Sequence, residues 1–214
     1  MILALAHTAL PTMKLRYLAL PLFASLALLS ACSKEDAGAP AASAPAAAAN
    51  TTPIAAAQAM DVLAAQGKGF AAGKILSTNA VYVLFDPQCP HCARLWEASM
   101  PLHTSVKFVW LPVAIMNAKS APQGAAIMTA TNPVQAMAAH ETSLLAGSGG
   151  TAASADIAPD VLAAIKTNTE LLERLGAASV PYIVARHQRS NQVVMQAGAN
   201  DTQALATFLG LGQP

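Results

Sequence analysis

Charged and aromatic side chains are scarce in this chain of 214 residues, at 11% and 5% of the sequence. Lys and Arg total 12 against 11 Asp and Glu, so no basic excess points to nucleic acid as a partner. With few aromatic rings available, the core must rely on Ala, Val, Leu, Ile and Met. Beyond residue 31, no uncharged run of large apolar residues is long enough to span a bilayer.

Cysteine is also rare, with three residues, two of which form the motif Cys89-Pro90-His91-Cys92. A zinc site would need two more good ligands. Cys32 is predicted to carry a lipid, as described below. His103, His140 and His187 are scattered and lack the paired spacing of metal ligands. We therefore expect no metal and no cofactor. A purely structural disulfide is an alternative, although so short a loop constrains the unfolded chain little.

The residues around the motif favour redox chemistry. Val81–Phe85 is a short apolar run, typical of a strand buried on both faces, and Asp86-Pro87-Gln88 ends it. Pro90 suits the first position of a helix, which places Cys89 at the N-terminal edge and Cys92 in the first turn. Free backbone N–H groups and the helix dipole stabilise a thiolate there, and a protonatable His91 adds to this.

The same placement makes the two thiols unequal. We expect Cys89 to be the exposed, acidic thiol, with a pKa well below the free value of about 8.5 and in the range of ~3.5–7.5. Cys92 lies further into the helix and should be buried. Trp96, on the same helix, is predicted to be a core residue.

The N-terminus has the pattern of an export signal. Met13–Arg16 is a short basic region, an apolar stretch follows from Leu18 to Leu29, and Leu29-Ser30-Ala31-Cys32 resembles a bacterial lipobox. We predict a signal peptide over residues 1–31, with Met13 as the candidate true start, and a lipid on Cys32. The alternative is a single membrane helix containing a buried cysteine, which the charged, Pro-rich sequence after it disfavours.

Export would place the protein in the periplasm, where a disulfide can persist. We expect lipid anchoring to a bacterial membrane, and Ser33 after the cysteine resembles the signal for the outer membrane. Residues 32–57, rich in Ala, Pro and Ser, are predicted to be a flexible tether, and residues 58–214 the folded domain.

The folded domain reads as an α/β protein with a helical insertion. A helix is expected to lead in before residue 67, and Val106–Val113 to be a second buried strand, parallel to the first through a right-handed crossover. Residues 118–176 are helical in character, and the candidate helices are 121–129, 133–146 and 159–175. Met116, Met128 and Met137 fit core filler better than copper ligands.

A second functional stretch is Ser179–Val184, where Pro181 opens an apolar strand. If the peptide bond before Pro181 is cis, the backbone beside it can face the dithiol and bind an extended substrate. An ordinary trans proline at a strand edge is the alternative, and the commoner one. Gln192–Ala197 should complete a hairpin, and Asp201 should cap a last helix over 202–209.

This order of elements resembles the thioredoxin fold, a mixed sheet flanked by helices, here with a helical insertion. The motif with Phe85-Asp86-Pro87-Gln88 before it, Leu111-Pro112-Val113, Ala125–Met128 and the stretch from Leu175-Gly176 through Pro181 more closely resemble the periplasmic DsbC/DsbG thiol–disulfide proteins. The resemblance covers roughly residues 68–210. Both CPHC and Val-Pro are shared with DsbA.

The resemblance implies that Cys89 attacks, that Cys92 resolves through a redox-active Cys89–Cys92 disulfide, and that Pro181 is cis and shapes the site. Val180 and Pro90 are the expected substrate contacts. Two features depart from the DsbC/DsbG pattern: Val180 replaces the usual Thr, and only a tether and a helix stand where that family has a dimerisation domain.

Two classes of function remain open from the sequence. The first is an enzyme that exchanges disulfides with exported, cysteine-containing proteins and is reset by an unidentified membrane redox partner. Within it, an oxidising direction is slightly favoured over DsbG-type reduction or isomerisation. The second is a binding protein, either a holdase or a copper carrier that uses the two sulfurs and His91.

Overall fold

The computed structural model describes residues 52–212 of the chain. The predicted signal peptide, Cys32 and most of the predicted tether lie outside the described residues. Within them the element order agrees closely with the sequence-based prediction: α1 (Ala59–Gln66), β1 (Phe70–Gly73), β2 (Ala80–Phe85), α2 (Pro90–Ser99), β3 (Lys107–Pro112), α3 (Ser120–Thr129), α4 (Pro133–Leu145), α5 (Pro159–Arg174), β4 (Tyr182–Arg186), β5 (Val193–Ala197) and α6 (Thr202–Leu209), with 3-10 turns at Ala56–Gln58 and Met100–Thr104.

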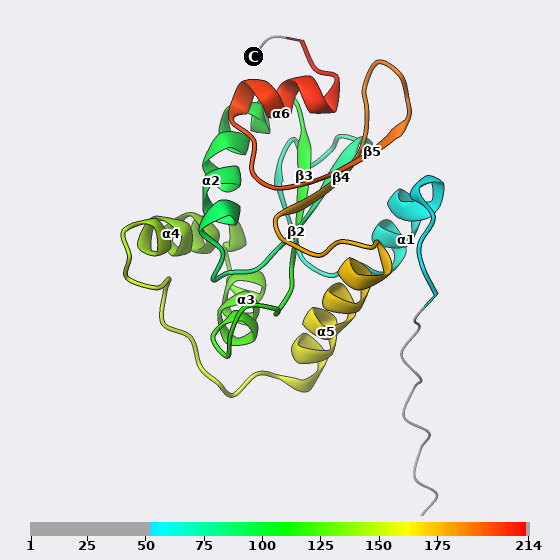
Figure 1. The fold of residues 1–214 in the computed structure, drawn as a ribbon. Helices are drawn as coiled ribbons and strands as arrows, with labels where there is room; N and C mark the ends of the chain where they lie inside the picture. The colour runs from blue at the N-terminus through cyan, green and yellow to red at the C-terminus, as the bar shows by residue number, and fades with distance from the viewer. Residues whose placement is uncertain (1–51, 213–214) are drawn as a thin grey trace, which may run out of the picture. The chain divides into compact units, whose positions relative to one another are not determined.

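The strands form one five-stranded mixed sheet in the order β1-β3-β2-β4-β5 (Figure 1). β2 and β3 run parallel and are connected through α2, whereas β1 on β3, β4 on β2 and β5 on β4 are antiparallel. The prediction missed β1, whose four residues include two alanines and a glycine, so that its sequence carries little strand signal. β2, which ends just before the CPHC motif, lies at the centre of the sheet.

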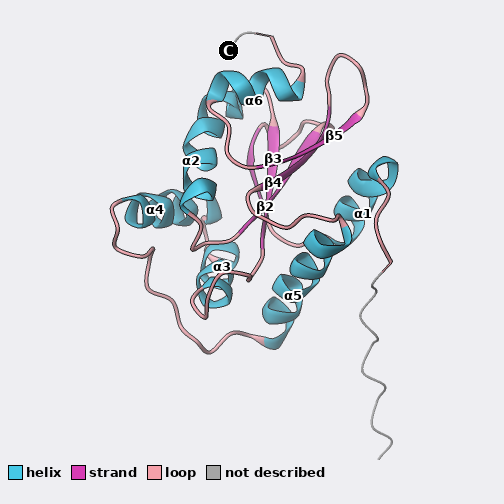
Figure 2. Ribbon diagram, viewed as in Figure 1, coloured by secondary structure: helices cyan, strands magenta, loops and turns pink. Residues whose placement is uncertain are grey.

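Helices cover both faces of the sheet (Figure 2). On one face, α2, α3, α4 and α6 contribute to a core that contains both motif cysteines and an aromatic cluster. Trp96 is 2% exposed and stacks edge-on to Trp110, as expected for a core residue. On the other face, α1 and α5 cover the sheet with Leu63, Leu171 and Leu172.

The chain already packs on the domain a few residues before α1. Ile54 is buried, and its backbone N–H donates to the carbonyl oxygen of Arg174 at the end of α5 over 2.8 Å. The guanidinium of Arg174 donates to the carbonyl of Thr52. Thr52 and Ile54 are therefore held against the end of α5 in this structure.

The helix ends follow from their sequences. α4 and α5 both begin with proline at the first position, after Asn132 and Ala158, as predicted. The Asp201 carboxylate accepts from the N–H of Ala204 at the start of α6, and Gly210 ends this helix with φ 70°. Among residues 52–212, no helix is long and apolar enough to cross a membrane.

Candidate redox-active site

The motif sits where the central strand gives way to α2. Pro90 is the first residue of α2, and Cys89 is its N-cap in an extended conformation, with φ −96° and ψ 109°. The N–H of Cys89 donates to the carbonyl of Asp86 over 2.9 Å, and Cys92 N–H donates back to the carbonyl of Cys89 over 3.0 Å. The strand, the turn and the helix therefore place Cys89 at the positive end of the helix dipole, as the sequence predicts.

The two thiols differ in acidity. A hydrogen bond from the Cys92 thiol, with smaller contributions from the backbone N–H groups of Cys92 and His91, lowers the pKa of Cys89 to about 7, against the opposing effects of burial and the Asp86 charge. Burial, and then the neighbouring Cys89, raise the pKa of Cys92 well above its ordinary value. A thiol with a pKa of about 7 is substantially a thiolate at neutral pH and is the nucleophile of the pair.

One part of the sequence-based expectation is wrong. Cys89 is not an exposed residue: its relative exposure is 4%, against 0% for Cys92. The side chain is covered because its sulfur points toward the loop before β4, where Sγ lies 3.5 Å from the carbonyl oxygen of Val180. Both cysteines are free thiols in this structure.

His91 acts on the thiol through its backbone. Its N–H is one of the groups that lower the pKa of Cys89, whereas its imidazole is exposed and lies with Nδ1 3.3 Å from Nη1 of Arg94. Pro90 beside it is also exposed. These two side chains therefore form the open rim of the motif.

The peptide bond between Val180 and Pro181 is cis, as the resemblance implied. Pro181 is buried and Val180 is half-buried. The backbone oxygen of Pro181 accepts from the N–H of Gly198 over 2.9 Å, which ties the loop to the end of β5. The structure thus brings Val180 together with Cys89, although 91 residues separate them.

Asp86 is a part of the site that sequence reasoning read only as a strand breaker. It is fully buried; its Oδ1 accepts from the N–H of Gln88 over 2.8 Å, and its Oδ2 accepts from Ile115 over 2.8 Å and Met116 over 3.0 Å. The carboxylate therefore joins the turn before Cys89 to the loop after β3. The available signal was an Asp directly after a buried strand, where backbone N–H groups need acceptors.

The helical insertion reaches the same turn. The Gln88 amide donates to the side-chain oxygen of Gln123 on α3 and to the carbonyl of Gly149 over 3.0 Å. On α4, Nε2 of the buried His140 lies 2.7 Å from the carbonyl oxygen of Pro87, and the adjacent Glu141 is buried as well. Gln123, His140 and Glu141 were not singled out from the sequence as part of a redox site.

The methionines do not converge on the cysteines as a set. Met137 is fully buried and Met128 packs beside the core, as expected for filler, while Met116 is 49% exposed on the loop after β3. Within the part of the chain that the structure describes, no three His, Cys, Asp or Glu side chains are grouped as metal ligands would be.

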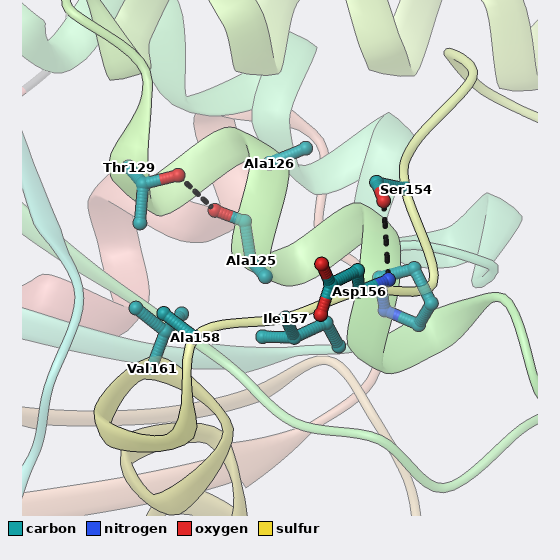
Figure 3. A pocket seen from close by; sticks show the side chains of 9 residues that line it. Ala125, Ala126, Thr129, Ser154, Asp156, Ile157, Ala158 and Val161 are labelled. Atoms are coloured by element: carbon teal, nitrogen blue, oxygen red, sulfur yellow. Dashed lines mark hydrogen bonds between the residues drawn. The ribbon is translucent and has the colours of Figure 1, made fainter.

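A separate pocket of about 310 Å³ lies between α3, residues 154–158 and the start of α5 (Figure 3). Its lining includes three alanines, Ile157 and Val161, and the Ser154 hydroxyl accepts a hydrogen bond from the N–H of Asp156. Neither motif cysteine lines this pocket, so it is distinct from the redox site.

The chain is similar in sequence to two curated thiol:disulfide interchange proteins. The chain is 30% identical over 148 residues to the thiol:disulfide interchange protein DsbG of Pseudomonas aeruginosa, covering 68% of this chain and 56% of that protein. It is 26% identical over 132 residues to DsbG of Escherichia coli, covering 61% and 52%. The chain thus spans about half the length of the curated relatives it matches. No family model matches the chain.

Solved structures agree on the fold. The catalytic domain of Proteus mirabilis ScsC superimposes with a TM-score of 0.55 at 19% identity, over 71% of this chain and 95% of that one. This chain is a relative of the thiol:disulfide interchange proteins, built on the thioredoxin fold. The thiol-disulfide exchange protein α-DsbA2 of Wolbachia pipientis gives a TM-score of 0.53 at 14% identity, over 72% and 94%. The thioredoxin-like fold expected from the sequence is confirmed.

Proposed function

We propose that this thioredoxin-fold protein is a periplasmic thiol:disulfide oxidoreductase that exchanges disulfides with exported, cysteine-containing proteins. The observation that carries the proposal is the inequality of the two thiols, with the pKa of Cys89 lowered to about 7 and that of Cys92 raised well above its ordinary value. Because the two thiols differ in acidity, Cys89 can attack or leave as a thiolate while Cys92 stays protonated.

In this mechanism, the Cys89 thiolate attacks one sulfur of a substrate disulfide and expels the other as a thiolate. Cys92 then attacks Cys89 Sγ, which forms the Cys89–Cys92 disulfide and releases the second substrate thiolate. Oxidation of a substrate runs through the same steps in reverse. The half-buried Val180 and the exposed Pro90 flank Cys89, and we assign them to contacts with the substrate backbone near its cysteine.

The acidity of Cys89 bears on the direction of exchange. A more acidic thiol stabilises the reduced form and makes the disulfide more oxidising: the nucleophilic cysteine has a pKa of about 7 in thioredoxin and about 3.5 in the oxidant DsbA. The sequence slightly favoured oxidation, partly through the His91 imidazole, but that ring is exposed and next to Arg94. The pKa of about 7 for Cys89 matches the thioredoxin value and not the DsbA value. Reductase-type exchange is therefore kept as the second candidate direction, beside oxidation.

Turnover of a dithiol or disulfide substrate tests the proposal. Wild-type protein should turn over with no added metal, and Cys89→Ser should abolish turnover while keeping the fold. Wild-type protein that shows no turnover would instead support the holdase or copper-carrier alternative, and turnover that survives in Cys89→Ser would rule out Cys89 as the nucleophile.

We further propose export and lipid anchoring at Cys32, on the basis of the lipobox-like Leu29-Ser30-Ala31-Cys32 and the basic and apolar segments before it. Metabolic labelling with a fatty acid should tag the wild-type protein and leave Cys32→Ser unlabelled. Equal labelling of both would exclude this site. A membrane redox partner that resets the dithiol belongs to the same proposal.

A further inference from the structure

Glu141 is a buried carboxyl group with no evident structural role. It lies on α4 of the helical insertion and is 1% exposed. Neither of its carboxyl oxygens has a hydrogen-bond partner among the described residues. Burying such a group without a partner is costly, so its presence here calls for a reason.

Its neighbour His140 shows where this turn of α4 lies. The N–H of Thr151 donates to His140 Nδ1 over 3.2 Å, so Nε2 carries the ring proton and donates to the carbonyl of Pro87 over 2.7 Å. Burial lowers the pKa of His140, which favours this neutral form. The bond fastens α4 to the turn that ends at Cys89.

Met137 places the same face of α4 against the cysteines. It is one helical turn before Glu141, is fully buried, and belongs to the core cluster that contains Cys89 and Cys92. α4 packs against α2, which carries the motif. Glu141 therefore faces the interior on the side of the dithiol.

The charged groups that act on Glu141 are anionic. Burial, and then the charges of Cys89, Glu97 and Asp86, raise the pKa of Glu141 to about 9. The other elements packed on α4, α3 and β1, contain no titratable side chain within their bounds. On α2, Arg94 and His91 are exposed and contact each other.

We propose that Glu141 exchanges a proton with Cys92 during disulfide exchange, an inference that rests on the proposed function. In the forming direction, the Glu141 carboxylate takes the proton of the Cys92 thiol, and the Cys92 sulfur attacks Cys89 Sγ. The electron pair of the broken mixed disulfide leaves on the substrate sulfur. In the reverse direction, Cys92 leaves as a thiolate and takes the proton from the Glu141 carboxyl.

The charge on Cys89 determines at which step Glu141 can accept the proton. While Cys89 is a thiolate, its charge disfavours a second negative charge on Glu141. When Cys89 enters the mixed disulfide, that charge is gone, and the Glu141 carboxyl releases its proton to solvent before its carboxylate takes the proton of Cys92. Glu141 does not hydrogen-bond Cys92 in this structure. The proposed transfer therefore needs one bridging water, the other arrangement in which an acid–base group reaches its partner.

Two-step release of thionitrobenzoate from its aromatic disulfide tests the inference. The reduced protein releases one coloured thiolate when Cys89 attacks and a second when Cys92 resolves the mixed disulfide. We expect Glu141→Gln to slow the second release on the order of 100-fold near neutral pH, the usual scale for positioned acid–base groups. The first release should change less than about threefold, because Glu141 takes no proton in that step. Glu97→Gln, which removes an exposed carboxylate that also acts on Glu141, is the matched control.

The pH profile separates proton exchange from a structural effect. In wild type, the plot of the second-release rate against pH should change slope where Glu141 ionises. In Glu141→Gln, the plot should depend only on the ionisation of Cys92. A second release in Glu141→Gln with the wild-type rate and profile, or one slowed equally in Glu97→Gln, would overturn the inference. If Cys89 gave no first release in wild type, the proposed function itself would fail.

An infrared difference spectrum between the disulfide and mixed-disulfide forms gives a second readout, which needs no variant kinetics. A protonated-carboxyl band should change between the two forms of wild type and be absent from Glu141→Gln. Identical spectra from both proteins would contradict the proton exchange.

Discussion

Two regions of the molecule meet at the candidate redox site and contribute different groups to it. The first region is the sheet together with α2, and the second is the helical insertion. The sheet side supplies the reacting sulfurs, the helix N-terminus and the Val180 carbonyl. The insertion supplies two buried polar groups: His140 bonds the turn before the motif, and the charge of Glu141 acts on Cys92. In the proposed mechanism, the first set determines which cysteine reacts, and Glu141 in the second set accepts or donates protons around it.

The largest effect on the sheet side is expected at Asp86. Asp86→Ala removes the acceptor of three backbone N–H groups and should lower the free energy of unfolding by about 3 kcal/mol or more. Denaturant unfolding measures this, with the exposed Glu173→Ala as control. A loss no larger than that of the control would mean that the 86–88 turn does not depend on the carboxylate.

The insertion side has the opposite character, because Glu141 costs stability. Its pKa rises from 4.5 to about 9 on folding, so between these values the folded protein binds a proton that the unfolded chain has lost. The contribution of Glu141 to stability therefore falls as pH rises through this window, by up to about 1.4 kcal/mol per pH unit.

Unfolding curves of wild type and Glu141→Gln between about pH 5 and pH 9 check this sign, because this range lies between the two pKa values. The free energy of unfolding of the variant should rise relative to that of wild type as pH rises. The opposing contribution of Cys89, whose lowered pKa adds stability above about pH 7, is present in both proteins and largely cancels. Curves that stay parallel would show that the carboxyl is not held protonated by burial.

A smaller effect separates the two thiols. The Cys92 hydrogen bond is the largest cause that lowers the pKa of Cys89, so Cys92→Ala should raise that pKa toward its ordinary value, by about one unit. Cys92→Ser keeps a donor and should raise it less. A Cys89 pKa that stays at the wild-type value in both variants, measured by alkylation across pH, would assign the acidity to the helix N-terminus alone.

The sequence predicted most helices and strands of both regions, but it did not predict the tertiary contacts that join the two regions at the site. Apolar runs and prolines at helix starts signal strands and helices directly, so β2, β3, β5 and the three inserted helices were predicted within one or two residues. The covered position of Cys89 was missed, although the Val180–Pro181 loop was expected to face the dithiol, because how closely Val180 packs on the sulfur depends on tertiary contacts.

The roles of Asp86, His140 and Glu141 depend on tertiary contacts that no local pattern encodes. His140 and Glu141 follow Met137 at helical spacing, three and four residues on, which puts all three on one face. That spacing was the available signal for buried polar groups. The spacing alone does not show that this face of α4 meets the dithiol.

The inequality of the thiols is tested most directly in the reduced wild-type protein. Iodoacetamide alkylation across pH, resolved by residue with mass spectrometry, should show Cys89 titrating with a pKa of about 7. Cys92 should stay unmodified to well above the ordinary range for a thiol, because burial raises its pKa. Two cysteines that titrate together near the free value of about 8.5 would contradict the proposed division of roles.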